Sequence, residues 1–596
     1  MKGLGISFGE GIIKSGKVYR RRSMPGHPRW VLFVIILSIS ILIAITRLVD
    51  LQIIRGAYFR GLAEGNRIRR IPIKAPRGEI LDRNGKVLAR NAPLYKLAKF
   101  SEGGVVIEAT LISREEALRL QTSSDGASIL IDIGREYPLG PAAAHVLGYV
   151  NEASREEVAG VSNDKCQMTN VKYGLGDLIG RMGIEAQYEC LLRGVNGEEL
   201  IEVDTRGRVI RKLGRREPVP GETIKLTIDA GLQEEAYKSL IEDRDREGNG
   251  AVYTGVVKGV VVAQDPITGE VRALVSAPSF DPQKINKEYQ TLADDPNMPF
   301  FNRAIGGAYH PGSTFKIVTA AAGLEDGKID GNYTFDDPGI IRIGEFSYSN
   351  WYFTQYGRKE GEIGLARAIT RSTDTFFYKL GEMVGVDRLA WWGERFGLGK
   401  KTGIDLPGEV GGLVPSPEWK ERVKGERWFL GNTYHISIGQ GDITATPLQI
   451  NSMTSVVASG GRLCWPYLLL DDGLQDAKRK TQNAGCEDLG FKAETLGLIT
   501  EGMIGACSPG GTAFPLFGFK FNRSASWRIA CKTGTAETNK EGLTHAWITS
   551  FAPAATESAQ VAPEIVVTAL VEGGGEGSRV AAPVVKEVLD YWFNKR

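Results

Sequence analysis

The run Pro311-Gly312-Ser313-Thr314-Phe315-Lys316, which continues through residues 317–324 (IVTAAAGL), is the part of the chain around which the rest is organised. Proline and glycine interrupt whatever precedes them, and the alanine-rich run predicts a closely packed helix. Ser313 therefore stands at a helix start. Lys316 projects from the same face one turn later, because residues three apart on a helix are neighbours. The spacing predicts that a hydroxyl and an amine are held together.

This pair is suited to acyl transfer. A serine hydroxyl is a weak nucleophile at neutral pH, and a lysine becomes its base when burial or a second cation lowers the lysine's pKa. Backbone N–H groups at the helix start place partial positive charge where an oxyanion would form. A serine three residues before a lysine also arises by chance in most long chains. The prediction for Ser313 and Lys316 therefore requires partners elsewhere.

The chain begins with a basic segment and an apolar run. Residues 1–29 contain many lysines and arginines against the single acid Glu10, and residues 30–46 (WVLFVIILSISILIAIT) are apolar apart from hydroxyls. We predict a membrane anchor at 30–50, with a cleavable signal peptide or a buried helix as the alternatives. Positive charge before the span predicts a cytoplasmic N-terminus and export of everything after it. The expected location is the cytoplasmic (inner) membrane, crossed once.

Composition fits a folded, exported body. The 596 residues are 42% hydrophobic and 24% charged, with a net charge of only +2, which argues against nucleic acid as a partner. No C-x-x-C or H-E-x-x-H motif occurs, so we expect no metal and no other cofactor. Disulfides are compatible with export, but spacing does not decide which cysteines pair. The six are Cys166, Cys190, Cys464, Cys486, Cys507 and Cys531.

Residues 51–245 alternate short β-like runs with turns rich in Gly, Pro and Asp. Residues 75–85 predict a loop, a strand and a tight Asn84-Gly85 turn. No nucleophile, base and orienting group occur together here, and His145 in its apolar run is expected to be a packing residue. We predict an extended α+β pedestal domain, used for binding or spacing, which ends at the charged segment 242–250.

Residues 246–596 predict a second domain of the mixed α/β class. A buried hairpin is expected from residues 255–265 and 270–276, and its counterpart is the β-prone run 564–571. A closing helix is expected at about 582–594. Strands at both ends of this half, with helices between them, suggest a mixed sheet that the chain terminus completes.

Two further stretches can complete the Ser313 site. Ser372-Thr373-Asp374, at a turn in the helical region 366–380, supplies a second hydroxyl and a carboxylate. The β-prone run 528–537 supplies Lys532-Thr533-Gly534-Thr535, in which the glycine would let a ligand approach the backbone closely. A second Lys-Thr-Gly, at Lys401, precedes a turn-rich stretch, and we predict a structural surface loop there.

The ordered set Ser-x-x-Lys, Ser-x-Asn/Asp and Lys-Thr-Gly resembles penicillin-binding proteins and serine β-lactamases. Other phrases of the chain resemble the monofunctional, class B penicillin-binding proteins, most like the elongation-type penicillin-binding protein 2 group. They are 310–316, 438–441 with 446–449, 532–537, 545–547 with 551–553, 77–78 with 82–85, and 135–138. The resemblance extends from the anchor to about residue 592. It implies a pedestal domain at 51–245 and a transpeptidase domain at 246–596, with a central antiparallel sheet flanked by helices.

The resemblance also implies an activity, peptidoglycan D,D-transpeptidation. Ser313 would attack the penultimate D-alanine carbonyl of a stem peptide, release the terminal D-alanine, and pass the acyl group to an amine of a neighbouring strand. Lys316 would take the Ser313 proton, Ser372 would shuttle protons, and Lys532 would add positive potential. Thr533 and Thr535 would hold the substrate carboxylate, and the N–H groups of Ser313 and Thr535 would form the oxyanion hole. β-Lactams would acylate Ser313.

Two residues depart from the family pattern. Asp374 stands where asparagine is commoner, and Cys531 replaces the usual glycine before Lys532. An ionised Asp374 beside Lys316 would oppose the base role, so we expect Asp374 to point toward Lys532 or the cleft instead. Some relatives bind a metal near the second motif through His and Cys, which residues 346–357 lack. No zinc is expected.

Other function classes share parts of this pattern. A β-lactam-hydrolysing or β-lactam-sensing protein would share the motifs but would not need so long a spacer, and a non-catalytic scaffold would not need the motifs. Asp374 and the phrase His310-Pro311-Gly312 favour elongation over division. The family implies a multi-pass glycan polymerase of the shape, elongation, division and sporulation family as partner, bound through the anchor and the pedestal.

Overall fold

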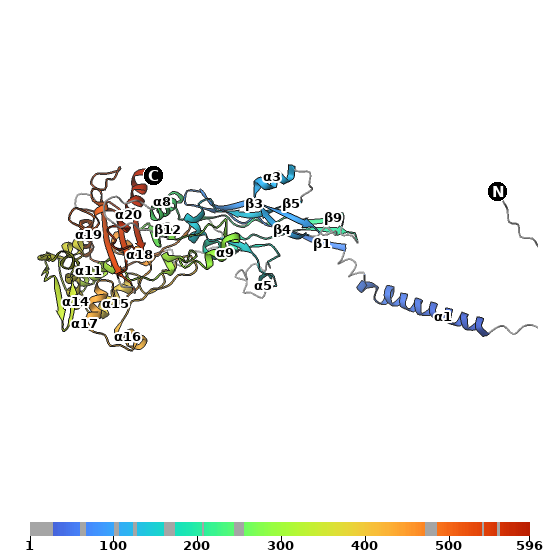
Figure 1. Ribbon diagram of the computed structural model, residues 1–596, viewed down its shortest axis with the longest axis horizontal. Helices are drawn as coiled ribbons and strands as arrows, with labels where there is room; N and C mark the ends of the chain where they lie inside the picture. The colour runs from blue at the N-terminus through green and yellow to red at the C-terminus, as the bar shows by residue number, and fades with distance from the viewer. Residues whose placement is uncertain are drawn as a thin grey trace, which may run out of the picture. The chain divides into compact units, whose positions relative to one another are not determined.

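The computed structural model describes residues 28–59, 67–100, 106–122, 128–159, 173–204, 208–242, 256–470, 485–538, 542–556 and 561–596. The chain forms two compact units, one of residues 1–71 with 198–215 and the other of residues 72–197 with 216–596 (Figure 1). Three sequence predictions fall outside the described residues. They concern the basic segment up to residue 27, the domain junction from 243 onward, and Cys166.

The first unit contains the predicted anchor. Helix α1 (Pro28–Val49) runs into a π-helical turn at Asp50–Ile54, and the apolar side chains along it are exposed (Figure 1). Residues 30–54 are long and apolar enough to cross a membrane, so the candidate span extends four residues beyond the predicted end at 50. Strands β1 (Ile68–Ile73), β8 (Gly197–Val203) and β9 (Val209–Arg216) form a sheet in the order β1-β8-β9.

The pedestal part of the second unit is built on a six-stranded sheet of order β18-β10-β2-β3-β4, in which β5 also pairs with β3. The predicted tight turn joins β2 to β3: the Asp82 carboxylate accepts the Asn84 and Lys86 N–H groups at 2.8 and 2.7 Å. His145 packs as predicted, with Nε2 2.8 Å from the Pro299 carbonyl oxygen. The strands are β2 (Ile80–Leu81), β3 (Val87–Phe100), β4 (Val106–Ile112), β5 (Ser128–Glu136), β10 (Ile224–Leu226) and β18 (Leu469–Leu470).

Smaller elements complete the pedestal. They are α3 (Arg114–Thr122), η2 (Gly140–Ala143), α4 (Ala144–Leu147), β6 (Val150–Glu152), α5 (Arg155–Val158), β7 (Leu178–Gly180), α6 (Gly183–Gln187) and α7 (Glu189–Leu192). A buried ion network ties two of them, α6 and α7, to β5 and to the segment that precedes β2. Arg77 donates to Glu185 and Glu189, both at 2.6 Å, and Arg135 donates to Glu185 at 2.7 Å. Arg77 and Arg135, which belong to two of the sequence stretches that resemble the family, therefore both donate to the Glu185 carboxylate.

The transpeptidase part holds a five-stranded sheet of order β12-β11-β22-β21-β20. Its strands are β11 (Gly259–Gln264), β12 (Val271–Ala277), β20 (Arg528–Glu537), β21 (Thr544–Ala554) and β22 (Ile565–Val571). Every neighbouring pair is antiparallel. The predicted hairpin and its C-terminal counterpart are confirmed. The expectation of a mixed sheet is wrong, because hairpin connections and the returning C-terminal strand all reverse direction.

Helices cover both faces of this sheet. Alternate side chains of β11 and β22 pack with α8 (Ala230–Ile241) and α20 (Ala581–Asp590) on one face. The other alternate set packs with α18 (Pro447–Ala458) and α11 (Lys316–Glu325), so that α11 is buried from Lys316 to Leu324. Figure 1 shows α18 and α20 beside the sheet. The predicted closing helix is α20, followed by a π-helical turn at Tyr591–Lys595.

The remaining elements surround this core. The helices are α9 (Ile285–Ala293), α10 (Arg303–Gly306), α12 (Trp351–Tyr356), α13 (Leu365–Arg371), α14 (Asp374–Val384), α15 (Val386–Arg395), α16 (Pro417–Lys424), α17 (Leu430–Ser437), α19 (Ala493–Ala506) and the 3-10 turns at Gly312–Phe315 and Phe514–Leu516. The small strand pairs are β13 (Thr334–Asp336) with β16 (Glu362–Gly364), β14 (Ile340–Ile343) with β15 (Phe346–Ser349), and β17 (Arg462–Cys464) with β19 (Cys486–Asp488).

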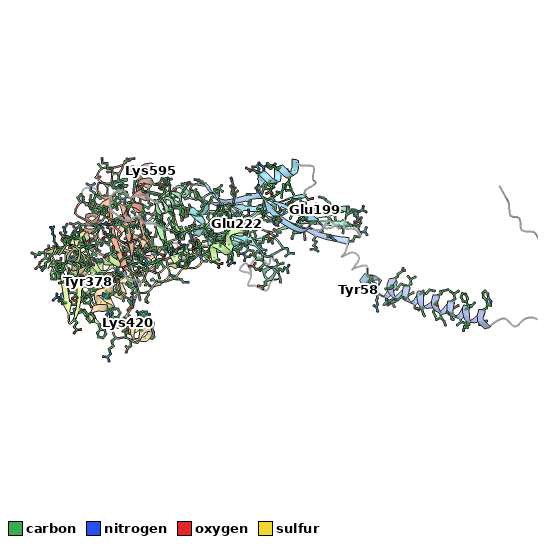
Figure 2. All side chains as sticks on the ribbon, viewed as in Figure 1. Tyr58, Glu199, Glu222, Tyr378, Lys420 and Lys595 are labelled. Atoms are coloured by element: carbon green, nitrogen blue, oxygen red, sulfur yellow. A yellow bond between two sulfur atoms is a disulfide. The ribbon has the colours of Figure 1, made fainter. Side chains whose placement is uncertain are left out.

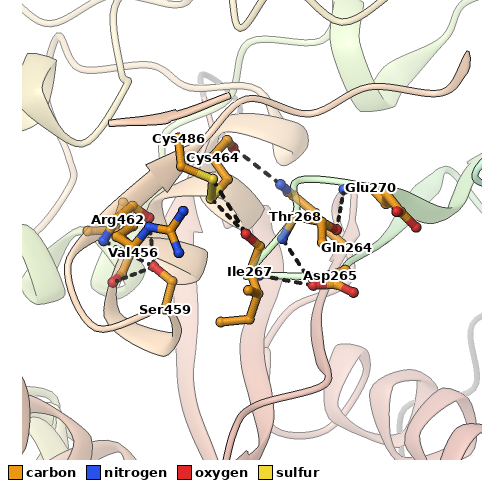
Figure 3. The surroundings of a disulfide bond; sticks show 10 residues. All are labelled: Gln264, Asp265, Ile267, Thr268, Glu270, Val456, Ser459, Arg462, Cys464 and Cys486. Carbon is orange, nitrogen blue, oxygen red and sulfur yellow. Dashed lines mark hydrogen bonds between the residues drawn. A yellow bond between two sulfur atoms is a disulfide. The ribbon is translucent and has the colours of Figure 1, made fainter. Parts of the chain in front are cut away.

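Two disulfides lie in the transpeptidase part. Cys464–Cys486 links β17 to β19, and each sulfur lies 3.3 or 3.4 Å from the carbonyl oxygen of Ile267 (Figure 3). Cys507–Cys531 links the end of α19 to β20, one residue before Lys532. Spacing alone left both pairings open.

The loop after Lys401 joins the two parts of the second unit. Asp405 accepts the Tyr188 hydroxyl at 2.7 Å and the N–H groups of Leu468 and Leu469 at 2.7 and 2.9 Å. Asp405 is only 8% exposed, so the expectation of a surface loop is wrong for its acidic residue. The reason is that the carboxylate satisfies backbone donors at the junction between pedestal and transpeptidase parts.

Candidate active site

The nucleophile candidate sits on a tight turn. Ser313 lies in the 3-10 turn Gly312–Phe315 that leads directly into α11, as the sequence predicts. The Gly312 N–H donates to the Gly439 carbonyl at 2.8 Å, and a Cβ added to Gly439 would lie 2.1 Å from the Gly312 carbonyl oxygen. The segment at Gly439 therefore fixes the backbone immediately before Ser313.

Lys316, the first residue of α11, is fully buried. Its ammonium donates to the Ser372 carbonyl at 2.8 Å, to Ser372 Oγ at 3.1 Å and to Asp374 Oδ1 at 2.7 Å. None of these three hydrogen bonds goes to Ser313 Oγ. Lys316 is therefore tied to the second motif in this structure.

The second motif connects α13 to α14. Ser372 has φ +57°, a left-handed conformation that reverses the chain after α13, and Asp374 begins α14. Asp374 Oδ2 accepts the Trp351 N–H at 3.1 Å while Oδ1 accepts from Lys316. The expectation that Asp374 points away from Lys316 is wrong. The left-handed turn directs the start of α14 back toward α11, and the carboxylate offsets part of the cost of burying a charged amine.

Lys532 reaches the same hydroxyl from the sheet. It projects from β20, is fully buried, and donates to Ser372 Oγ at 2.8 Å. Two amines thus converge on one serine hydroxyl, and the Asp374 carboxylate contacts one of them, Lys316. The three motifs that were recognised separately in the sequence meet at Ser372.

The electrostatics of the two amines differ. Burial lowers the pKa of Lys316 below the usual 10.5, although Asp374 opposes this effect. Burial and repulsion from Lys316 lower the pKa of Lys532 well below its usual value, again against the attraction of Asp374. One carboxylate faces two buried amines, and this is the physical reason that the pKa of Lys532 is lowered despite the attraction of Asp374. The role of Lys532 as a source of positive potential stays a prediction.

The rest of the third motif forms one wall of a cleft. Thr533 Oγ1 lies 2.7 Å from Thr512 Oγ1, and Thr535 is exposed. A Cβ on Gly534 would lie 3.1 Å from Trp547 Cβ and 3.2 Å from Thr314 Cγ2. Close packing of β20 against its neighbours is therefore an observed reason for glycine here, beside the predicted approach of a ligand.

The cleft has a volume of about 1500 Å³, and its lining includes Ser313, Ser372, Asp374, Thr533 and Thr535. Gly534 also lines it, whereas Lys316 and Lys532 lie beneath its floor. Lys401 does not line the cleft, which agrees with its prediction as structural.

Sequence reasoning missed several residues of the cleft wall. Tyr348, Trp351, Tyr378, His435 and Glu537 all line it. Tyr378, from α14, is labelled in Figure 2. Only Glu537 carried a usable signal, since it follows Thr535 by two residues on a predicted strand and so shares its face.

Within the described ranges, no group of three or more His, Cys, Asp or Glu side chains is arranged so that it could hold a metal ion. The arrangement of one cleft-lining hydroxyl, a bridging hydroxyl and two buried amines is suited to proton transfer and acyl transfer.

Two family models match the chain. The penicillin binding protein transpeptidase domain matches residues 259–590, and the penicillin-binding protein dimerisation domain matches residues 99–226. With the antiparallel sheet and the three-motif site, these matches define the class: the chain belongs to the penicillin-binding protein family.

Individual relatives narrow the resemblance to penicillin-binding protein 2. The chain is 33% identical to the peptidoglycan D,D-transpeptidase MrdA of Acinetobacter baumannii, over 94% of this chain and 86% of that protein. It is 32% identical to MrdA of Escherichia coli K12, over 94% and 92% respectively.

Solved structures agree with this grouping. PBP2 of Pseudomonas aeruginosa in complex with WCK 5153 is 32% identical, with a TM-score of 0.65, over 88% of this chain and 96% of that one. PBP2 of Helicobacter pylori in complex with MreC has 26% identity and a TM-score of 0.69, over 88% and 98%. A chain described under the coordination of polymerization and crosslinking by a peptidoglycan synthase complex has 31% identity and a TM-score of 0.73, over 96% and 99%.

Proposed function

We propose that this protein is a peptidoglycan D,D-transpeptidase of the elongation type that works through a serine acyl-enzyme. The observation that carries the proposal is the convergence of Lys316 and Lys532 on Ser372 directly beneath the cleft that Ser313 lines. The similarity to MrdA proteins over 94% of this chain supports the same activity. The similarity to MrdA proteins and PBP2 structures does not favour the alternatives, a β-lactam-hydrolysing or sensing role and a division role.

Acylation begins at Ser313. Its Oγ attacks the carbonyl of the penultimate D-alanine, and the proton passes to Lys316, whose lowered pKa makes the neutral amine accessible. The backbone N–H groups of Ser313 and Thr535 stabilise the oxyanion, and losing one such donor costs about a hundredfold or more in rate. The C–N bond then breaks and the terminal D-alanine leaves as the amine.

Ser372 relays protons between the buried amines and the cleft. Its hydroxyl accepts from both Lys316 and Lys532 and also lines the cleft, so it is in place to protonate the leaving D-alanine nitrogen. In the second half of the reaction, the acceptor amine loses a proton along the same path as it attacks the acyl-serine. The path is used once in each direction, and the enzyme returns to its starting protonation state.

The third motif holds the substrate. Thr533 and Thr535, which line the cleft, bind the terminal carboxylate of the stem peptide, and Gly534 keeps the strand close to the peptide. β-Lactams acylate Ser313 because they present an equivalent amide and carboxylate, but their leaving group stays attached and the adduct is long-lived.

Helix α1 anchors the enzyme in the cytoplasmic membrane, with the N-terminus in the cytoplasm and the catalytic domain outside. The 30–54 span supports this location. We also propose that the anchor and pedestal bind a multi-pass glycan polymerase of the shape, elongation, division and sporulation family, because a monofunctional enzyme cross-links glycan made by others. The solved complexes of a relative with MreC and of a peptidoglycan synthase support protein partners.

The test of the nucleophile is the intact mass after exposure to a β-lactam. The wild-type chain should gain one long-lived adduct, and Ser313→Ala should gain none while remaining folded. Ser526→Ala, which alters an exposed serine, serves as the matched control. Stable labelling of Ser313→Ala would refute the assignment, and rapid loss of the wild-type adduct would favour a hydrolase.

The two Lys-Thr-Gly sequences provide a second test. Lys532→Ala should slow acylation by at least about a hundredfold, because Ser372 loses one of its two amine partners. Lys401→Ala changes an exposed residue and should stay within about threefold of wild type, since a surface substitution changes stability by only about 0.5 kcal/mol. Acylation rates of the two variants are measured with a fluorescent penicillin. A large loss of rate in Lys401→Ala together with a small one in Lys532→Ala would show that the wrong Lys-Thr-Gly motif was assigned to the site.

A further inference from the structure

Glu537 occupies the far end of the same strand that carries the substrate-binding hydroxyls. Thr533, Thr535 and Glu537 alternate along β20, so they share one face, and all three line the cleft. Glu537 is exposed, and within the described ranges no ion pair or side-chain hydrogen bond engages its carboxylate. A carboxylate is therefore presented to whatever lies along β20.

Aromatic rings line the part of the cleft in which the Glu537 carboxylate acts electrostatically on Tyr378 and His435. Tyr348 and Tyr378 both line the cleft, with ring centroids 5.7 Å apart, and Tyr434 stacks on Tyr378 at 5.2 Å. The His435 ring lies 5.8 Å from Tyr348. Figure 2 locates Tyr378 in this part of the transpeptidase domain. Aromatic faces attract ammonium groups.

The pKa values of two of these side chains, Tyr378 and His435, shift in the direction that favours the uncharged ring. Burial raises the pKa of Tyr378, and the negative charges of Asp374 and Glu537 raise it further. Burial lowers the pKa of His435, although Glu537 and Asp442 oppose the change. Neither ring therefore supplies a positive charge to Glu537. Among the described residues that line the cleft, the one lysine or arginine is Arg579, which pairs with Glu576 at 2.9 Å.

The length of the strand fixes which part of a stem peptide would reach Glu537. Glu537 lies four positions after Thr533, which corresponds to about 13 Å along β20. A peptide whose terminal carboxylate sits at Thr533 and Thr535 places its third residue, counted from that end, about 7 Å away. An extended side chain of that residue is about 6 Å long, so its terminal amine comes within reach of the Glu537 carboxylate when the side chain leans along β20 toward it.

We propose that Glu537, beside the rings of Tyr348 and Tyr378, binds the side-chain ammonium of the third residue of the donor stem peptide and so selects donors in which this amine is free. The inference rests on the proposed function. It adds a basis for selectivity: a stem whose amine has already been consumed in a cross-link, or capped, is a poorer donor.

The experiment compares two pentapeptides on the full-length enzyme, L-Ala-γ-D-Glu-L-Lys-D-Ala-D-Ala and its Nε-acetyl derivative, by the kcat/KM for D-alanine release. Wild type should prefer the free amine by about tenfold, as expected for one charge-assisted contact. Glu537→Gln should reduce this ratio to about one, and Glu537→Asp should retain part of it. Because each ratio is taken on one preparation, loss of folded enzyme cancels.

The control is Glu234→Gln, which makes the same change in net charge on an exposed position of α8 and should keep the wild-type ratio. Equal use of both peptides by the wild type, or an unchanged ratio in Glu537→Gln, would overturn the inference while β-lactam labelling of Ser313 still upheld the proposed function. If neither labelling nor D-alanine release occurred in the wild type, the proposed function would fail and this inference with it.

Discussion

Asp374 is the carboxylate that acts most directly on the charge of Lys316 in the candidate site. Its carboxylate is 2.7 Å from Lys316 Nζ, whereas an asparagine would offer that amine a neutral oxygen. Burial pushes Lys316 toward the neutral amine, and Asp374 pulls it toward the ammonium. The base function that we propose for Lys316 therefore depends on a balance between desolvation and one ion pair.

Asp374→Asn should shift the pH dependence of acylation. Acylation requires neutral Lys316, and the neutral fraction rises as pH rises through the pKa of that lysine. Removing the anion that favours the ammonium lowers this pKa, so the ascending limb should move to lower pH by about one unit or more. Stopped-flow acylation with a β-lactam across pH measures the shift. If the ascending limb of the pH profile lay at the same pH in Asp374→Asn as in the wild type, Lys316 would not be the group whose titration controls acylation.

The identities of the site residues could be predicted because each motif is local. Ser313 and Lys316 are one helical turn apart, and Thr533 and Thr535 alternate on a strand, so spacing alone places their side chains on one face. The direction of Asp374 could not be predicted, because it depends on the left-handed φ of Ser372. A serine at φ +57° is uncommon, and the residues next to Ser372 in the sequence do not predict this left-handed conformation.

At the level of elements, the turn that carries Ser313 depends on Gly439. Gly439→Ala should slow acylation by at least about tenfold, because the new Cβ would meet the Gly312 carbonyl oxygen at 2.1 Å and displace the turn by about an ångström. Gly385→Ala is the matched control: its φ of +81° gives similar backbone strain, but open space surrounds it. Gly385→Ala should lower only thermal stability. Equal acylation by both variants would contradict the role of Gly439.

The two disulfides close loops of similar length but differ in their distance from the site along the chain. They span 22 and 24 residues, so the removal of either pair should cost about 3 kcal/mol of unfolding free energy. Only Cys507→Ala with Cys531→Ala should also slow acylation, because this bond holds β20 next to Lys532. Denaturant unfolding and β-lactam acylation measure the two effects. A similar slowing in Cys464→Ala with Cys486→Ala would contradict a positioning role for the Cys507–Cys531 bond.

Element types were predicted where periodicity and turn residues agreed. The hairpin of β11 and β12 follows from two apolar runs around Pro266 to Gly269, and α11 follows from its alanine-rich run. Strand direction was not accessible from spacing, since an antiparallel return and a crossover leave the same apolar runs. The disulfide pairing could not be predicted from the sequence either, because it depends on which elements pack side by side.

For the second unit as a whole, Asp405 links the pedestal to the transpeptidase part. Asp405→Ala should lower the unfolding free energy by about 3 kcal/mol, because a buried hydroxyl and two buried N–H groups lose their acceptor. Tyr188→Phe removes only the hydroxyl and should cost about 1 kcal/mol. Calorimetry on both single variants and the double variant measures the coupling. Strictly additive costs would show that the Tyr188–Asp405 contact contributes nothing across the junction.

The Cys507–Cys531 bond also restricts how the protein can be produced. Disulfides persist in oxidising compartments and are reduced in ordinary cytosol. A version truncated before Pro72 and expressed in a reducing bacterial cytosol would carry two thiols beside Lys532. Recombinant preparations for inhibitor screening therefore need a secretion signal or an oxidising host strain, and reducing agents should be left out of the assay buffer.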